Sequence, residues 1–172
     1  IDNFRLAFIL TRHLLEQGCK TVKFVARPYS APTVQLRIFG YLQALREANV
    51  ASSPSDIFIE DNYDADFTRR LLDNMSQPGV LCANDTTASR LMHTLTDQGY
   101  KIPADVKVAV VDDIKYANYL RVPLTTYKQP CKDIAKVTVD LMFSRIQEPG
   151  QKARTIYLDG ELIVRKSTDK SA

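Results

Sequence analysis

Apolar residues recur along the chain at two different spacings. In several segments they lie three and four positions apart, which predicts helices that bury one face. The predicted helices cover residues 4–15, 38–48, 67–75, 88–95, 115–120 and 132–146. Short runs that are largely apolar lie between these segments and predict buried strands. The predicted strands cover residues 21–26, 56–59, 80–83, 106–111 and 124–127.

Polar and glycine residues mark the ends of several predicted helices. Asp2 or Asn3 can cap the first helix and Asp64 the third, because a side-chain oxygen there accepts from unpaired backbone N–H groups. Gly18 and Gly99 follow the first and fourth helices, where a left-handed residue commonly ends a helix.

Apolar strands that alternate with amphipathic helices are typical of the α/β class. We therefore expect a doubly wound parallel sheet flanked by helices in one unit over residues 1–172. The chain is also expected to end in a C-terminal β-hairpin, with strands over 154–158 and 162–165 and a turn at Asp159-Gly160. In such sheets ligands bind outside the carboxyl ends of the strands. The residues expected there are 27–33, 60–63, 84–85 and 112–113.

Composition narrows the possible partners. The chain has 172 residues, 45% of them hydrophobic, and a formal net charge of only +3 without a dense Lys/Arg stripe. Nothing in this charge pattern is typical of a nucleic-acid surface, and no apolar run has the roughly 20 residues that a membrane span needs. Cys19, Cys82 and Cys131 lack metal-ligand spacing, so we expect small buried side chains in a reducing compartment.

The usual motifs of catalysis are missing. The six glycines form no G-x-G-x-x-G, P-loop or G-x-S-x-G pattern, and we expect no catalytic residue, metal or cofactor. His13 and His93 fall within helical patterns and are expected on helix surfaces. The pair Asp112-Asp113 ends a strand, but without a third convergent ligand or a nearby histidine it is weak evidence for metal or acid–base chemistry. The order of motifs also argues against a phosphoacceptor receiver domain.

Binding suits these residues better than catalysis does. An amide offers donors and an acceptor, a carboxylate accepts from hydroxyl groups, and a guanidinium donates to oxygens. Asn84, Asp112 and Arg37 therefore predict a site for a small polyhydroxylated molecule. We expect Asp85 to cap the following helix while Asn84 faces the ligand.

Three long motifs resemble one family. The run LCANDTTASRLMHTLTDQGYKIPADVKVAVVDD is followed by PLTTYKQP, and two earlier segments read DNFRLAFILTRHLLEQGCKTVKFV and LRIFGYLQALREANV. In this order and spacing they resemble the periplasmic-binding-protein-like effector domain of LacI/GalR-type transcription regulators over nearly the whole chain.

The resemblance implies a set of effector-binding residues. Arg37 would hold ligand hydroxyls, Asn84 supplies the amide of the A-N-D motif, and Asp112 is the first acid of the D-D motif. Three further positions are implied: a hydroxyl that faces the ligand at Thr33, an aromatic near the sugar-stacking position at Tyr63, and a residue at the crossover into the hinge at Gln129.

The chain departs from the family pattern at several glycines. The substituted positions are Leu6, Arg27, Asn49, Arg90 and Val110. Asn49 is a mild change because asparagine tolerates a left-handed helix end. Val110 is expected to narrow the space where backbone and ligand approach each other. The chain also has no tryptophan to form a sugar platform.

The resemblance also implies the surrounding architecture. The chain would be mainly the C-terminal lobe of an effector domain, with residues 128–150 crossing toward an N-terminal lobe, and a DNA-reading helix-turn-helix would lie upstream of it. The helix over 132–146 would pack partly on that other lobe, so its apolar face is expected to be underused here. A homodimer interface is implied for Ser89, Arg90, His93, Tyr116 and Leu120.

The expected function is effector sensing in a cytoplasmic transcription regulator. Its partners would be a small effector, expected to be a carbohydrate, a second copy of the chain, and DNA only through the upstream domain. No membrane contact is expected. The alternative is a periplasmic sugar-binding protein of a transport system, which shares the two-lobed fold, and upstream sequence would separate the two.

Overall fold

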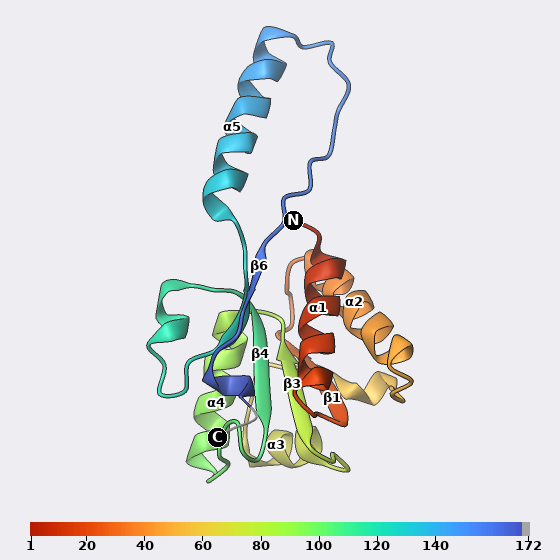
Figure 1. Cartoon of the computed structure of the whole chain (residues 1–172), viewed down its shortest axis with the longest axis vertical. Coiled ribbons are helices and arrows are strands. Elements are labelled where there is room, and N and C mark those ends of the chain that lie inside the picture. The colour runs from red at the N-terminus through yellow and green to blue at the C-terminus, as the bar shows by residue number, and fades with distance from the viewer. Residues whose placement is uncertain (170–172) are drawn as a thin grey trace.

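The computed structural model describes residues 1–169, so the last three residues of the expected 1–172 unit lie outside it. Its centre is a six-stranded sheet in the order β2-β1-β3-β4-β5-β6 (Figure 1). The strands are β1 (Thr21–Ala26), β2 (Ile57–Ile59), β3 (Pro78–Cys82), β4 (Lys107–Asp112), β5 (Thr125–Lys128) and β6 (Glu161–Ile163). The first five are parallel and β6 is antiparallel to β5.

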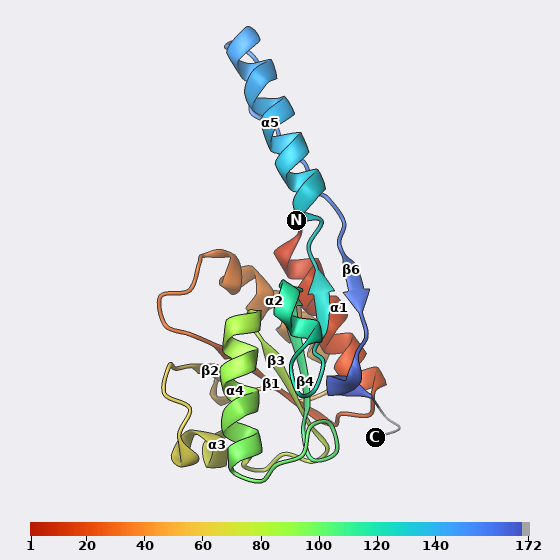
Figure 2. The ribbon, with the colours of Figure 1, turned by 90° about the vertical axis from the view of Figure 1, so that its left-hand side faces the viewer.

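Helices cover both faces of this sheet (Figures 1 and 2). The helices are α1 (Asn3–Glu16), α2 (Thr33–Glu47), α3 (Ala65–Leu72), α4 (Asp85–Asp97) and α5 (Cys131–Gln147). Three short 3-10 turns are η1 (Pro54–Asp56), η2 (Lys115–Asn118) and η3 (Lys166–Thr168). Five of the six predicted helices and the five parallel strands are confirmed, and with them the doubly wound α/β class, whereas the predicted helix over 115–120 is only the 3-10 turn η2.

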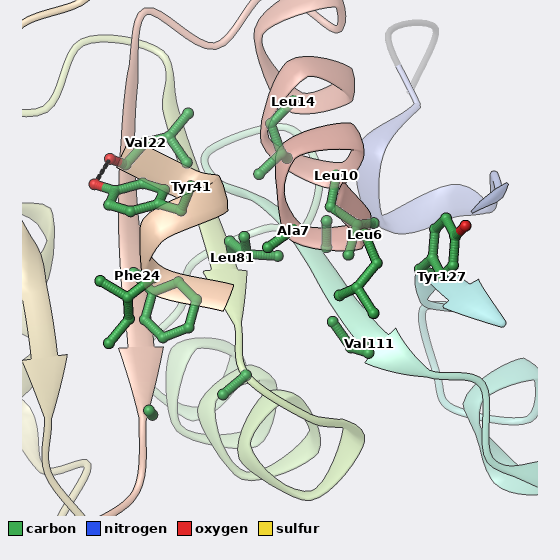
Figure 3. Packing of buried hydrophobic residues seen from close by; sticks show 14 of the residues in the cluster. Leu6, Ala7, Leu10, Leu14, Val22, Phe24, Tyr41, Leu81, Val111 and Tyr127 are labelled. Carbon is green, nitrogen blue, oxygen red and sulfur yellow. Dashed lines mark hydrogen bonds between the residues drawn. The ribbon is translucent and has the colours of Figure 1, made fainter. Parts of the chain in front are cut away.

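Alternate residues of the central strands enter two separate cores. On one face, Phe24 and Leu81 pack under α1 and α2 (Figure 3). On the other, Val25 and Val80 pack under α3 and α4. Because neighbouring residues of a strand point to opposite faces, strands covered on both sides must be apolar throughout.

Local capping agrees with the sequence at most helix ends. Asp2 accepts from Arg5 N and Asp64 from Phe67 N, both at 2.9 Å. Gly18 and Gly99 have φ of 92° and 88°. Asn49, in place of a family glycine, takes a left-handed φ of 55° after α2.

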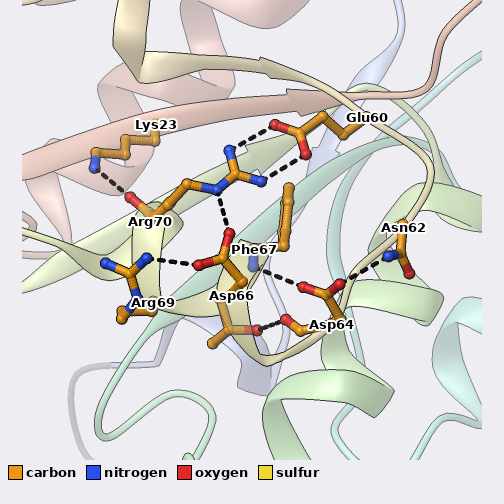
Figure 4. Close-up of polar contacts among 9 residues, drawn as sticks. Lys23, Glu60, Asn62, Asp64, Asp66, Phe67, Arg69 and Arg70 are labelled. Atoms are coloured by element: carbon orange, nitrogen blue, oxygen red, sulfur yellow. Dashed lines mark hydrogen bonds and ion pairs between the residues drawn. The ribbon is translucent and has the colours of Figure 1, made fainter.

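The edge of the sheet at β2 is tied to α3 by charged side chains (Figure 4). Arg70 donates twice to Glu60, at 2.8 and 2.7 Å, and also pairs with Asp66. Lys23 Nζ donates to the carbonyl oxygens of Arg70 and Asp73, where α3 ends. A cation at the C-terminus of a helix satisfies carbonyl groups that have no partner within the helix.

The predicted C-terminal hairpin is wrong. Residues 154–158 form no strand, and Glu161–Ile163 instead pair with β5 as β6. The edge of an existing sheet offers unpaired backbone groups, whereas an isolated two-stranded hairpin is marginally stable in water. Gly160 is required at this junction, because a Cβ there would lie 2.4 Å from both Lys128 O and the Tyr127 ring.

The prediction that His13 lies on the helix surface is also wrong. It is 4% exposed, and its Nε2 lies 2.9 Å from Thr168 Oγ1 in η3. His93 is exposed, as expected. Cys19 and Cys82 are buried and Cys131 is exposed, and all three are free thiols.

Helix α5 leaves the rest of the fold. None of its side chains is buried, and in Figure 1 it extends away from the sheet together with the segment that returns to β6. Four of its large apolar side chains are about half exposed: Val139, Met142, Phe143 and Ile146. The face that was expected to be underused, Ile134, Val137 and Leu141, is partly buried, and the exposed apolar side chains are the four named above. Across residues 1–169, no helix is long and apolar enough to span a membrane.

Candidate functional site

Arg37 joins three elements at the carboxyl edge of the sheet. It lies on the buried face of α2 and is only 8% exposed. Its Nε donates to Asn3 Oδ1 at 2.9 Å, its Nη1 donates to the carbonyl oxygen of Ala83, and its Nη2 lies 3.8 Å from Asp112 Oδ1. Burial lowers the pKa of Arg37, and the charge of Asp112 acts in the opposite direction. The guanidinium is therefore fixed between the ends of β3 and β4.

Asp112 ends β4 in a backbone conformation that non-glycine residues rarely adopt. Its φ is 117°, and that of Asp113 is 59°. The turn is held from Asp113, whose N–H donates to Thr126 Oγ1 at 3.1 Å and whose carboxylate pairs with Arg165 at 2.7 Å. Such conformations persist only where surrounding contacts impose them. Here they set the direction of the Asp112 carboxylate.

The Asp112 carboxylate is partly buried and has two partners. Gln129 Nε2 donates to Asp112 Oδ1 at 2.5 Å, and Arg37 faces the same oxygen. Burial raises the pKa of Asp112, while Arg37 and Gln129 both oppose this rise. The other oxygen, Oδ2, has no hydrogen bond to the residues that the structure describes and can accept from a ligand hydroxyl.

The prediction that Asp85 caps α4 is wrong, because Asn84 takes that role. Asn84, with extended φ and ψ of −157° and 169°, is the N-cap of α4, and its Oδ1 accepts from Thr87 N at 2.9 Å. Asp85 is already the first helical residue, so its side chain cannot take that role. It turns inward instead, is 1% exposed, and accepts from Ile114 N at 2.9 Å. Asn84 keeps its amide nitrogen free of protein partners within residues 1–169.

Tyr63 lies in the core beside the expected site. It is 7% exposed, its ring centroid is 4.8 Å from that of Phe67, and the Arg90 guanidinium covers it at 5.3 Å. Burial is the main reason that the pKa of Tyr63 is raised to about 12. The structure does not bring this ring into contact with Arg37 or Asp112.

Arg27, Asp61 and Arg90 form an ion cluster next to Tyr63 that the sequence did not predict. Arg27 donates to Asp61 through Nε at 2.9 Å and through Nη2 at 3.3 Å. Arg90 donates to both the carboxylate and the carbonyl oxygen of Asp61. Both arginines stand where the family resemblance expects glycine. An acidic residue placed after β2 was the signal that could have revealed their shared partner.

Of the remaining predicted residues, Thr33 lies on α2, and the proposed interface residues lie on α4, in η2 and just after η2. Thr33 is exposed at the first turn of α2. Ser89, His93 and Leu120 line a cavity of about 350 Å³ between α4 and the segment after η2. Tyr116, in η2, is 43% exposed. Arg90 is exposed on α4 but is already paired with Asp61.

The chemistry of this edge is that of hydrogen bonding to a polar molecule. Asp112 supplies an acceptor, while Arg37 and Asn84 supply donors, which matches vicinal hydroxyl groups. The described part of the chain contains no group of three His, Cys, Asp or Glu side chains able to hold a metal ion.

Comparison with known proteins places this fold in a class. Residues 11–168 match the family model described as periplasmic binding protein-like domain, and the chain belongs to that family. Within it, the chain is similar to LacI-family regulators, as the motifs predicted.

Two curated relatives illustrate the similarity. The HTH-type transcriptional repressor PurR of Vibrio campbellii is 31% identical over 168 residues, which cover 95% of this chain and 50% of that protein. The ribose operon repressor of Haemophilus influenzae is 31% identical over 165 residues, covering 93% and 49%. The chain thus spans about half the length of the curated relatives it matches.

Solved structures agree in fold. The transcription regulator CcpA of Lactococcus lactis has a TM-score of 0.85 at 26% identity, covering 98% of this chain and 63% of that one. A LacI-family regulator from Enterococcus faecium with bound ribose has a TM-score of 0.83 at 27% identity, covering 97% and 63%. A CelR–cellobiose complex has a TM-score of 0.86 at 26% identity, covering 97% and 52%.

Proposed function

We propose that this chain is the C-terminal lobe of the effector-binding unit of a LacI-type transcription regulator. The observation that carries the proposal is the cluster of Arg37, Asp112 and Gln129 at the carboxyl edge of the sheet, with Asn84 one residue from the carbonyl that Arg37 binds. The effector is a small polyhydroxylated molecule, a carbohydrate. Relatives solved with ribose and with cellobiose support this ligand class.

Helix α5 supports the two-lobed arrangement. Several of its apolar side chains lack a covering surface, and the chain leaves the sheet after Lys128 and returns at Glu161 in the neighbouring strand β6. We propose that an N-terminal lobe covers α5 and that the effector lies between the lobes. Closure around the ligand would shift the population between two states of the regulator, which a few kcal/mol of differential affinity suffices to do.

The regulator would be cytoplasmic and homodimeric, and would reach DNA through a domain outside this chain. Because the curated relatives are repressors, the regulator is favoured over a periplasmic transport protein. For the same reason we propose that the chain binds its ligand without transforming it. The dimer would form at Ser89, Arg90, His93, Tyr116 and Leu120.

Ligand binding by the full-length regulator tests the site. A thermal-shift screen of sugars, sugar phosphates and nucleosides identifies the effector, because a ligand that binds only the folded state raises the unfolding temperature. Calorimetric titration then compares wild type with Asp112→Ala. Glu47→Ala is the control, since Glu47 is exposed and bonds only to Gln43. The site assignment predicts loss of binding in Asp112→Ala alone, and equal affinities in all three proteins contradict it.

A further inference from the structure

The side-chain amide of Gln129 occupies one of the two carboxylate oxygens of Asp112, Oδ1, and leaves Oδ2 free within residues 1–169. Gln129 Nε2 donates to Asp112 Oδ1 at 2.5 Å, and Arg37 Nη2 lies 3.8 Å from the same atom. A carboxylate oxygen has about two lone-pair sites. One ligand hydroxyl can reach the free Oδ2. A vicinal pair of hydroxyls that engages both oxygens must compete with the Gln129 amide at Oδ1, because Arg37 faces the other side of that atom.

Gln129 is the partner of Asp112 that can yield. The Asp112 backbone is fixed through Asp113, which Thr126 and Arg165 hold. Arg37 is buried and has two further hydrogen-bond acceptors, Asn3 and Ala83. The Gln129 side chain makes no second hydrogen bond to any residue that the structure describes. Breaking one contact is enough to free it.

The position of Gln129 links this contact to the exit of the chain from the sheet. β5 ends at Lys128, which is paired in register with Asp112, and α5 begins at Cys131. No α5 side chain is buried, and within residues 1–169 none forms a hydrogen bond or ion pair with the sheet or with α1 to α4. The Gln129 amide is thus the last side-chain contact that orients the chain before α5.

We infer that Gln129 is a positioning residue that opposes effector binding: its amide holds Asp112 and the start of α5 together until an effector hydroxyl takes its place. The inference rests on the proposed function, because it assumes that the effector binds Asp112. It gives Gln129 an effect opposite to that of a direct ligand contact. Release of Gln129 would couple occupancy of the site to the orientation of α5.

The two possible roles of Gln129 predict opposite changes in the affinity for D-ribose when its amide is removed. Loss of a direct ligand contact weakens binding, whereas loss of a residue that opposes binding strengthens it. Gln129→Leu keeps the approximate volume of the side chain and removes its donors. Gln98→Leu is the matched control, because Gln98 is exposed at the end of α4. Calorimetric titration of the full-length regulator with D-ribose is expected to show binding about tenfold tighter in Gln129→Leu, or about 1.4 kcal/mol, and unchanged in the control. A wild-type protein that binds D-ribose as tightly as Gln129→Leu, or more tightly, overturns the inference.

Hydrogen exchange tests the same contact without any ligand. Backbone amides of residues 128–134 are expected to exchange several-fold faster in Gln129→Leu than in wild type or Gln98→Leu, because their anchor is lost. Unchanged exchange overturns the inference whatever D-ribose does. If exchange accelerates while no protein binds D-ribose, the positioning role stands and the failure belongs to the choice of effector in the proposed function.

Discussion

Asp85 accepts a hydrogen bond from Ile114 through Oδ2, while its Oδ1 is buried without a partner in the described part of the chain. The carboxylate lies close enough to Asp112 and Asp113 to feel their charge, with Arg165 acting in the opposite direction. Burial is the largest cause that raises the pKa of Asp85 to about 6, from 3.8. Folding therefore favours the protonated form of this side chain.

The contribution of Asp85 to stability should consequently fall as pH rises from about 4 to 6. In that window Asp85 holds its proton more often in the folded than in the unfolded state, so its contribution to the free energy of unfolding drops by about 2 to 3 kcal/mol and then levels off. Asp85→Asn removes this titration and should flatten that part of the curve. Urea unfolding between pH 4 and 8 measures it. Asp140→Asn, at an exposed position of α5, is the control, and equal slopes in all three proteins would contradict the assignment.

Arg37 is expected to contribute to stability as well as to ligand binding. Arg37→Met keeps the buried hydrocarbon portion but removes the donor to Asn3 Oδ1 and to the Ala83 carbonyl, and the ion pair with Asp112. Removing one partner of a buried polar network costs about 2 to 4 kcal/mol. Chemical denaturation at pH 7 tests this against Arg46→Met, whose side chain is exposed at the end of α2. A loss below that of Arg46→Met would show that the network is dispensable.

The close contact of α1 and α2 depends on Gly40. A Cβ at this position would lie 2.0 Å from the carbonyl oxygen of Phe4, so the two helices would have to move apart. Gly40→Ala should therefore destabilise the chain by about 1 to 3 kcal/mol, although alanine favours helix formation. Gly150→Ala meets no atom within 4 Å and serves as the control in thermal unfolding. A stable Gly40→Ala variant would mean that the helices tolerate a wider separation.

Replacing Tyr116 with a charged residue should weaken self-association. The proposed dimer places η2 and α4 against a second copy, and a buried aspartate without a partner opposes such contact. Sedimentation equilibrium is expected to show at least about tenfold weaker dimers for Tyr116→Asp, or about 1.4 kcal/mol. Tyr157→Asp, also at an exposed tyrosine, should leave association unchanged. A wild-type chain that remains monomeric at high concentration would argue against this interface.

Elements that depend on near neighbours could be read from the sequence. Asp64 caps α3 because its carboxylate reaches the N–H of Phe67, three residues away. Asn49 ends α2 in a left-handed conformation because its own side chain tolerates it. Helical spacing and apolar strands identified the α/β class for the same reason, since each pattern reports on burial within one segment.

Contacts between distant segments could not be read in this way. His13 lies in a helical pattern typical of a surface, yet it is buried against Thr168, 155 residues later. Arg27 and Arg90 are 63 residues apart in sequence, yet both pair with Asp61, and Arg90 lies over the Tyr63 ring. The predicted site is similar: Arg37 and Asp112 were identified individually, but their shared geometry with Gln129 was not.

The sequence by itself determined the alternation of helices and strands, most helix ends and the residue types at the carboxyl edge of the sheet. Only the tertiary structure decided that Asn84 rather than Asp85 caps α4, that β6 joins β5, and that Gln129 holds Asp112. The physical reason is that periodicity and capping act within a few residues, whereas strand pairing and buried hydrogen bonds depend on which distant groups folding brings together.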